Sequence, residues 1–591
     1  AEKKLLWKGN KYFAGLTQFF DHLEKETYKI QYRVLLSRYR GKTTCPECQG
    51  SRLRGDAAYV KIGGISLIDL VLWPISKVKT FFEELKLNEH DHSVARRILI
   101  EINNRLDYMN RVGLGYLTLN RLSSTLSGGE FQRIKLATSL GSALVGSMYI
   151  LDEPSIGLHP RDTERLISVL EMLKQMGNTV IVVEHEEEIM RAADQIIDIG
   201  PEAGRHGGQL IFQGNLEAAL ADKTTDSHTL RFLNGQDSIA IPAFRRKPLA
   251  HIEIHGAQEN NLKNVDVKIP LGILSVVTGV SGSGKSTLIR KILYPAMMRN
   301  LQLGTEETGK YREIKGSLSK ISGVEMVDQQ PIGKSSRSNP ITYIKAYDAI
   351  RLLYSELPLA KSRGYKPAHF SFNVEGGRCE TCQGEGEITI EMQFMADIKL
   401  TCESCNGLRF KQEILDIKFQ EKSIAEILDM TVEESIPFFK EKMPRIAEKI
   451  EPLFQVGLGY IKLGQSSNSL SGGEAQRVKL ASFLGKGNSN KGKTLFIFDE
   501  PTTGLHFHDI KKLLKALNDL VEQGDTVLII EHNMEVIKCA DHIIDLGPEG
   551  GENGGNICFE GTPEEMVGLK NNPTAFYLTQ KLTPKKSNIR S

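Results

Sequence analysis

The stretch Thr278-Gly279-Val280-Ser281-Gly282-Ser283-Gly284-Lys285-Ser286-Thr287 decides the fold. An apolar, β-branched run at 273–277 predicts a buried strand before it, and the apolar run at 288–293 predicts a helix after it. Strand, glycine-rich loop and helix, in that order, are the context of the motif G-x-x-x-x-G-K-[ST], whose backbone N–H groups bind a polyphosphate. Lys285 is predicted to reach the β- and γ-phosphates and Ser286 to hold Mg²⁺. The predicted nucleotide-binding residues are Gly279, Ser281, Gly282, Ser283, Gly284, Lys285, Ser286 and Thr287.

Length and composition are those of a globular protein with several domains. The chain has 591 residues, of which 40% are hydrophobic and 25% charged, and its net charge is +2, whereas single cores stop growing near about 250–300 residues. No apolar run reaches the roughly 18–20 residues of a membrane span, and Ala1-Glu2-Lys3-Lys4 shows no signal peptide. We therefore expect a cytoplasmic protein with no membrane partner.

The same succession of segments appears twice along the chain. Segments 45–50, 112–116, 126–137, 149–154 and 180–185 return, in this order, at 402–407, 456–460, 470–481, 496–501 and 527–532. The two L-S-G-G-E segments are 471 − 127 = 344 residues apart, and such colinear matches indicate a tandem duplication. A first copy of the phosphate loop would fall at 285 − 344 = −59. We therefore expect the natural protein to extend further at its N-terminus.

Each L-S-G-G-E segment predicts a helix start. S-x-x-E is a capping box, and two glycines just inside the helix leave backbone N–H groups free to bind a γ-phosphate. A plain helix cap is the alternative, but each copy is also followed by an apolar strand that ends in Asp-Glu. The predicted phosphate contacts are Ser127, Gly128, Gly129, Glu130, Ser471, Gly472, Gly473 and Glu474.

Polar residues end the two repeated strands that follow. They form the pairs Asp152 and Asp499, Glu153 and Glu500, and His185 and His532. The aspartates are expected to order Mg²⁺ through water, and the glutamates to polarise the attacking water. The histidines are placed to sense the γ-phosphate. Gln329 is a further candidate ligand for water and Mg²⁺, with Gln330 as its rival.

These motifs together resemble the ATP-binding cassette superfamily. The resemblance implies an α/β fold of two ATPase modules paired head to tail, with nucleotide between the phosphate loop of one and the L-S-G-G-E signature of the other. One composite site is then complete, between Lys285 and Ser127–Glu130. The expected segments are the rest of signature domain I at 1–125, the end of ATPase module I at 126–240, the start of ATPase module II at 241–292, signature domain II with a zinc module at 293–469, and the end of module II at 470–591.

Six cysteines occur in C-x-x-C pairs, which indicates metal binding in a chain without an export signal. Cys379 and Cys382, followed after 19 residues by Cys402 and Cys405, fit a four-thiolate Zn²⁺ site. Reduced cysteines without metal are the alternative. Cys45 and Cys48 supply half of a second site.

The zinc module, together with segments 328–340, 370–379 and 499–506, resembles the UvrA family, the damage-sensing component of bacterial nucleotide-excision repair. That resemblance covers nearly the whole chain and implies that about a third of the protein, at its N-terminus, is absent. It further implies an ATPase that binds damaged double-stranded DNA, loads UvrB, forms a homodimer and does not itself cut DNA. Cations in Gly/Pro/Ser-rich loops are expected to contact DNA phosphates: Lys334, Arg337, Arg363, Lys366 and Arg378.

Two other functions stay open at this point. A tandem cassette ATPase could drive a transporter or act on ribosomes, although the zinc module and the long insertion before the second signature argue against it. Alternatively, the metal module could dock a protein, with DNA bound by the absent third.

Overall fold

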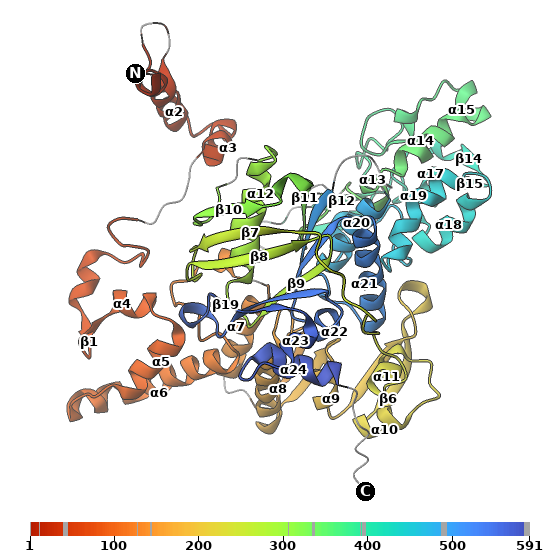
Figure 1. Cartoon of the computed structure of the whole chain (residues 1–591). Helices are drawn as coiled ribbons and strands as arrows, with labels where there is room; N and C mark the ends of the chain where they lie inside the picture. Colours follow the sequence, from red (N-terminus) through yellow and green to blue (C-terminus); the bar gives the residue numbers. More distant parts are fainter. Residues whose placement is uncertain are drawn as a thin grey trace. The chain divides into compact units, whose positions relative to one another are not determined.

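The computed structural model describes residues 2–583 except 11, 13, 40–44, 127, 142–144, 305–306, 334–336, 391, 393–396 and 486–492 (Figure 1). Two predicted site residues, Ser127 and Lys334, lie outside the described residues. The chain divides into a first unit of residues 1–74, 84–94 and 118–122 and a second unit of residues 75–83, 95–117 and 123–591. Each unit is described by itself.

The first unit is built mainly from short helices. Its elements are α1 (Glu2–Lys8), α2 (Gly15–Lys25), α3 (Ile30–Tyr39), β1 (Lys61–Ile62), β2 (Ile65–Ser66) and α4 (Leu67–Leu72). Ser66 caps α4 by accepting a hydrogen bond from the N–H of Asp69, and β1 pairs with β2 in a small antiparallel hairpin. Helices α5 (Ile75–Glu84) and α6 (Glu89–Arg111) follow in the chain.

A six-stranded sheet forms the centre of the second unit. Its order is β11-β16-β17-β9-β18-β19; the first five strands are parallel, and β19 runs antiparallel to β18. Figure 1 shows the green strand β9 beside the blue strands, so segments far apart in sequence complete one sheet. The bounds are β9 (Leu274–Gly279), β11 (Ile321–Val327), β16 (Lys493–Asp499), β17 (Thr526–Ile530), β18 (His542–Gly547) and β19 (Asn556–Gly561).

Both faces of this sheet are buried, as expected for strands that are apolar throughout. Val277 and Ile530 point into a core shared with the antiparallel sheet β10-β7-β8 (Glu313–Gly316, Ala250–Ala257 and Val265–Leu271). Val276 and Ile529 point into a second core shared with α21 (Phe507–Glu522). Successive side chains alternate between faces because the strand period is two.

The first module repeats part of this architecture. Two-stranded sheets β3-β4 (Met148–Asp152 and Thr179–Val183) and β5-β6 (Ile196–Gly200 and Gln209–Gly214) correspond to β16-β17 and β18-β19. In the second module β9 lies between β17 and β18, but within the described first module no strand joins β4 to β5. Ile150 on β3 is 67% exposed, whereas its counterpart Ile497 is fully buried in the core that β16 shares with β7 and β8.

The remaining helices frame these sheets. In module I they are α7 (Gly128–Gly141), α8 (Pro160–Gln175), α9 (Glu187–Ala192), α10 (Leu216–Ala221) and α11 (His228–Leu233). After β9 come η4 (Thr287–Leu293), α12 (Tyr294–Asn300), α13 (Pro340–Tyr343), α14 (Tyr347–Glu356), α15 (Pro358–Ser362), α16 (Gln412–Leu415), α17 (Ile424–Asp429), α18 (Val432–Lys440), α19 (Pro444–Gln455) and α20 (Gly472–Leu484). The chain closes with α22 (Met534–Ile537), α23 (Pro563–Met566) and α24 (Pro573–Leu582).

Two hairpins, β12-β13 (Glu387–Ile390 and Ile398–Thr401) and β14-β15 (Lys418–Phe419 and Lys422–Ser423), belong to the inserted region. Aromatic side chains fill its interior, including Phe370 and Phe372, which are fully buried. These rings pack inside the domain and are therefore not available for stacking on bases. Among the described helices, none has the length and apolar character needed to cross a bilayer.

Candidate functional site

The phosphate loop has the backbone that its glycines predict. Gly279, Gly282 and Gly284 adopt φ values of 129°, 75° and 112°, which L side chains rarely adopt. A Cβ atom on Gly279 would lie 2.0 Å from the carbonyl oxygen of Leu546, so this position has no room for a side chain. The loop follows β9 directly and leads into η4, so the strand, loop and helix predicted from the sequence are present.

The lining of the loop suits an anion. Lys285 is buried, and its ammonium donates 2.9 Å hydrogen bonds to the carbonyl oxygens of Gly279 and Val280. Burial lowers the pKa of Lys285 to about 8, against the attraction of Glu500 and other carboxylates. Among the residues that the structure describes, the buried hydroxyls of Ser281 and Ser283 have no hydrogen-bond partner. Free donors around a desolvated cation are what a bound phosphate requires.

The two strand-end acids of module II lie beside this loop. Asp499 forms a 2.5 Å ion pair with Arg290, one helical turn after Ser286. Glu500 has a left-handed backbone with φ of 48°, and burial, reinforced by Asp499, raises its pKa to about 7. A non-glycine residue held in this conformation is a feature of functional sites. The carboxylate of Asp499 and the hydroxyl of Ser286 are the hard oxygen donors that suit Mg²⁺.

His532 lies 4.0 Å from Glu500, measured from Nε2 to Oε1. Burial, and then the positive charge of Lys285, lower the pKa of His532 well below its usual value, so its imidazole is neutral at neutral pH. The ring of His159, from module I, lies 6.1 Å from that of His532, centroid to centroid. The histidine of one module is thus covered by a residue of the other.

Each of the two glutamates predicted to be catalytic lies against the opposite module. A Cβ atom on Gly157 of module I would lie 3.0 Å from Glu500, and one on Gly504 of module II would lie 3.2 Å from Glu153. Both glutamates and both strand-end histidines line a cavity of about 50 Å³ between the modules. Glu153 shares the left-handed backbone, with φ of 45°, and His185 Nε2 is 3.7 Å from its Oε1. Each module therefore presents its glutamate to the other module in the same way.

The first signature reaches the phosphate loop through Tyr116. The Tyr116 hydroxyl donates a 2.5 Å hydrogen bond to Glu130 Oε1. Its ring atoms lie 3.0–3.2 Å from where a Cβ atom on Gly282 would be, so the ring rests on the loop. The second copy repeats the polar half: Tyr460 donates a 2.6 Å hydrogen bond to Glu474.

The signature helices begin as the sequence predicts. Helix α7 begins at Gly128, and Gly129 packs against the carbonyl oxygen of Ile156. Helix α20 is capped by Ser471, whose hydroxyl accepts from the N–H of Glu474 while Glu474 accepts from the N–H of Ser471. A Cβ atom on Gly473 would approach the carbonyl oxygen of Thr503 to 2.7 Å, so these helix starts pack closely on the loops that follow the Asp-Glu strands.

The remaining predicted nucleotide ligands have the following positions. Gln329 donates a 3.0 Å hydrogen bond to Thr503 Oγ1, and its side chain packs against Gly472. Its role as a Mg²⁺ ligand stays a prediction. Asp152 is exposed at the end of β3, and Thr287 accepts a 3.2 Å hydrogen bond from Asn260.

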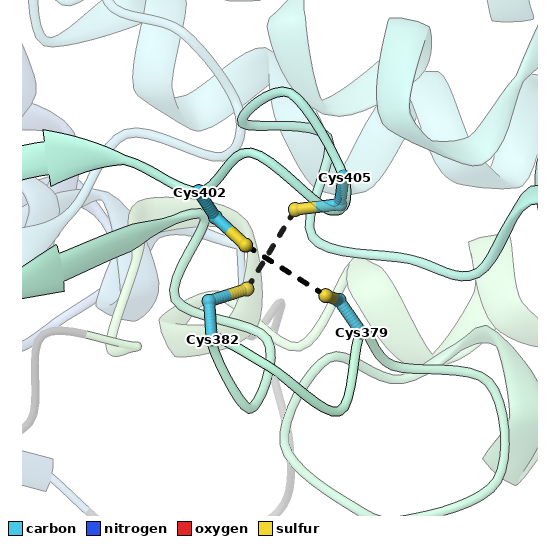
Figure 2. A group of neighbouring side chains, drawn as sticks. All are labelled: Cys379, Cys382, Cys402 and Cys405. Atoms are coloured by element: carbon cyan, nitrogen blue, oxygen red, sulfur yellow. Dashed lines mark hydrogen bonds between the residues drawn. The ribbon is translucent and has the colours of Figure 1, made fainter.

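Four cysteines form a compact cluster whose geometry suits a metal ion (Figure 2). The sulfur atoms of Cys379, Cys382, Cys402 and Cys405 all lie within 4.8 Å of one another, and all four side chains are buried. The Cys379–Cys402 and Cys382–Cys405 sulfur pairs are 3.9 and 3.7 Å apart. Tetrahedral Zn–S bonds of about 2.3 Å place sulfurs roughly 3.8 Å apart. The donor set therefore fits a four-thiolate metal ion.

The other two predicted metal ligands lie in the first unit. Cys45 is exposed and Cys48 half-buried. Within the described residues, no cluster of three or more metal-binding side chains includes either of them. They stay a predicted half-site.

The predicted DNA contacts are mostly ion-paired. Arg337 lies 3.5 Å from Glu385, Arg363 3.3 Å from Asp416, and Arg378 3.6 Å from Glu375. Lys366 caps the short helix at Pro367–Phe370. Partly exposed pairs of this kind contribute about 0–1 kcal/mol, so phosphates can compete for these cations.

Sequence reasoning missed Tyr116, His159, Gly157 and Arg290 as parts of the site. The first three belong to the repeated segments or lie just beyond them, so the duplication itself carried a signal: Tyr460, His506 and Gly504 are their second copies. Nothing in the sequence places Arg290 on Asp499.

Curated relatives and one solved structure indicate the family of this chain, although no model of a known protein family matches it. The UvrABC system protein A of Methanothermobacter thermautotrophicus is 51% identical over 566 residues, 96% of this chain and 58% of the relative. That of Halalkalibacterium halodurans is 53% identical over 567 residues, 96% of this chain and 59% of the relative. The chain thus spans about three fifths of the length of these curated relatives.

The crystal structure of UvrA2 from Deinococcus radiodurans superposes with a TM-score of 0.84 at 40% identity, covering 93% of this chain and 69% of that chain. The predicted α/β fold is confirmed: cassette modules in tandem, an inserted helical domain and a four-cysteine cluster. The chain belongs to the UvrA family.

Proposed function

We propose that this chain binds and hydrolyses ATP at a composite site made by the phosphate loop of module II and the signature of module I. The observation that carries the proposal is the position of Glu500. It lies beside the loop of Lys285 and against Gly157 of the opposite module, so both modules contribute to one reaction centre.

The roles follow from the chemistry of each side chain. Lys285 and the loop N–H groups bind the β- and γ-phosphates. Ser286 and Asp499 hold Mg²⁺, which neutralises phosphate charge. Glu500, with a pKa of about 7, orients and deprotonates the attacking water. Neutral His532 contacts the γ-phosphate, and the start of α7, with Gly128, Gly129 and Glu130, approaches it from the other module.

Three variants test this assignment. Lys285→Ala is expected to lose nucleotide binding. Glu500→Gln is expected to keep binding and lose turnover, because only the base is removed. Glu153→Gln is the matched control, because it removes the equivalent carboxylate of module I, which has no described phosphate loop beside it. Turnover should persist in this variant. Equal loss of turnover in Glu153→Gln and Glu500→Gln would contradict the composite site.

We further propose that the four-cysteine cluster holds Zn²⁺. Its sulfur spacing and full burial support that ion, which prefers tetrahedral thiolate sites. Metal analysis of the purified chain is expected to give one tightly held zinc ion, and an empty cluster in folded protein would contradict this.

The biological role proposed here is recognition of damaged DNA in nucleotide-excision repair, in the cytoplasm, with UvrB as partner and a homodimer as the working form. Family membership supports it, and Arg337, Arg363, Lys366 and Arg378, with Lys334, supply phosphate contacts. The test is binding to a duplex with and without one bulky adduct, at fixed salt with Mg-ATP. Tighter binding to the adduct supports damage sensing by this chain. Equal affinity for both duplexes would contradict it.

A further inference from the structure

The ion pair between Arg290 and Asp499 lies where the proposed nucleotide site needs a metal ion. Asp499 is the acid expected to serve Mg²⁺, yet Arg290 Nη2 contacts its Oδ2 at 2.5 Å. The Asp499 side chain is only 14% exposed, so its charge has little water to stabilise it. The guanidinium of Arg290 supplies the countercharge to this carboxylate.

The electrostatic surroundings explain why Asp499 binds a cation. Burial raises its pKa, and the negative charge of Asp328 raises it further, whereas Arg290 and Lys285 lower it. Lys285 donates to loop carbonyls, so the direct contact comes from Arg290. A carboxylate cannot give the same oxygen to a guanidinium at 2.5 Å and to a metal ion or its tightly held water, because the two cations would repel each other.

We propose that Arg290 is a placeholder cation that occupies the Mg²⁺ side of Asp499 and must release this carboxylate when Mg²⁺-nucleotide binds. The inference rests on the proposed nucleotide site. Arg290 can leave readily, because its side chain is 41% exposed and the freed guanidinium can be hydrated. Because this contact must break before the metal binds, Arg290 lowers the apparent affinity for Mg²⁺. Until nucleotide binds, the guanidinium neutralises the charge of Asp499.

The direction of the effect is the opposite of that expected for a residue that binds phosphate. Arg290→Gln removes the competitor, so Mg²⁺ should strengthen nucleotide binding more in the variant than in the parent. Lys291→Gln is the matched control: it removes one positive charge at the next residue of the same helix, from an exposed side chain. Long-range electrostatics change in both variants, whereas the contact with Asp499 changes only in the first.

The experiment measures the dissociation constant of a fluorescent, non-hydrolysable ATP analogue in EDTA and in saturating Mg²⁺. The ratio of the constant in EDTA to the constant in Mg²⁺ reports how much Mg²⁺ strengthens binding of the analogue. We expect Arg290→Gln to raise this ratio about twofold to fivefold, the range of a partly exposed ion pair, and Lys291→Gln to leave it unchanged. Bound Mn²⁺, counted by electron paramagnetic resonance at a fixed analogue concentration, should rise in parallel.

Three results would overturn the inference. An unchanged ratio in Arg290→Gln shows that Arg290 does not compete with the metal. Weaker binding of the analogue both in EDTA and in Mg²⁺ shows that Arg290 binds phosphate instead. Equal increases in both variants show a general charge effect. A parent chain that binds no analogue in either condition overturns the proposed function as well, so the two failures are distinguishable.

Discussion

Tyr116 should couple the first signature to the phosphate loop, and two alanine variants isolate that coupling. Tyr116→Ala removes a half-buried ring that rests on Gly282 and a hydroxyl that donates to Glu130. Tyr460→Ala removes the same ring and the same Tyr–Glu hydrogen bond in the second copy, where the ring packs against Gly204 instead. Truncating a fully buried aromatic ring costs about 3–5 kcal/mol of unfolding free energy, and each variant is expected to lose less than this because both rings are half-buried.

The polar part of this loss can be measured separately. The Tyr116 hydroxyl is 2.5 Å from a carboxylate, and a hydrogen bond to a charged group contributes about 1.5–3 kcal/mol. Tyr116→Phe should therefore lose that amount and keep the ring on the loop. Urea unfolding measures these differences in unfolding free energy, provided that the m-value, the slope of free energy against urea concentration, is the same in all variants.

The functional distinction is the stabilisation by nucleotide. Mg²⁺ and a non-hydrolysable ATP analogue should raise the urea unfolding midpoint of Tyr116→Ala less than that of the parent chain, because the ring no longer packs on the phosphate loop. Tyr116→Phe and Tyr460→Ala should show the rise of the parent chain. The reasoning is refuted if Tyr460→Ala loses as much of the nucleotide-induced rise as Tyr116→Ala.

Three further changes test other features. The ammonium of Lys581 lies 2.6 Å from a carboxylate oxygen on α9 of module I and 3.2 Å from one on α22 of module II. Lys581→Met removes this cation and should lower the free energy of unfolding in urea by about 2–4 kcal/mol. The control, Lys570→Met at an exposed position, should leave that free energy almost unchanged. Burial and neighbouring glutamates raise the pKa of Glu186 to about 8; the folded chain therefore holds an extra proton between about pH 4.5 and 8, and stability falls as pH rises through that window. Gln at this position should flatten the fall, and an unaltered pH profile would show that the carboxyl is not desolvated. If the cluster holds zinc as proposed, Cys402→Ser should release that ion to a chromogenic chelator, whereas Cys45→Ser should not.

Much of the fold and part of the site follow from sequence because they depend on local backbone requirements. The glycines of the phosphate loop, the strand before it and the capping box of Ser471 are each specified by residues within a few positions. The C-x-x-C pairs likewise predict the cysteine cluster, since four thiolates need only two adjacent turns.

Contacts between the modules could not be predicted in this way. That Gly157 lies on Glu500, or His159 on His532, depends on how two distant parts of the chain dock. The ion pair of Arg290 depends on the direction of one long side chain. Sequence spacing carries no information about either.

The bare strand faces of module I have a consequence for handling the protein. Ile150, Val183 and Ile199 are 67%, 50% and 67% exposed on β3, β4 and β5, and β4 and β5 have no described strand on their facing edges. Open edges beside apolar side chains are templates for pairing between chains, in the manner of cross-β aggregation. Concentrated solutions of this chain should therefore associate through module I, and a charged substitution on these faces should improve colloidal stability without disturbing the phosphate loop.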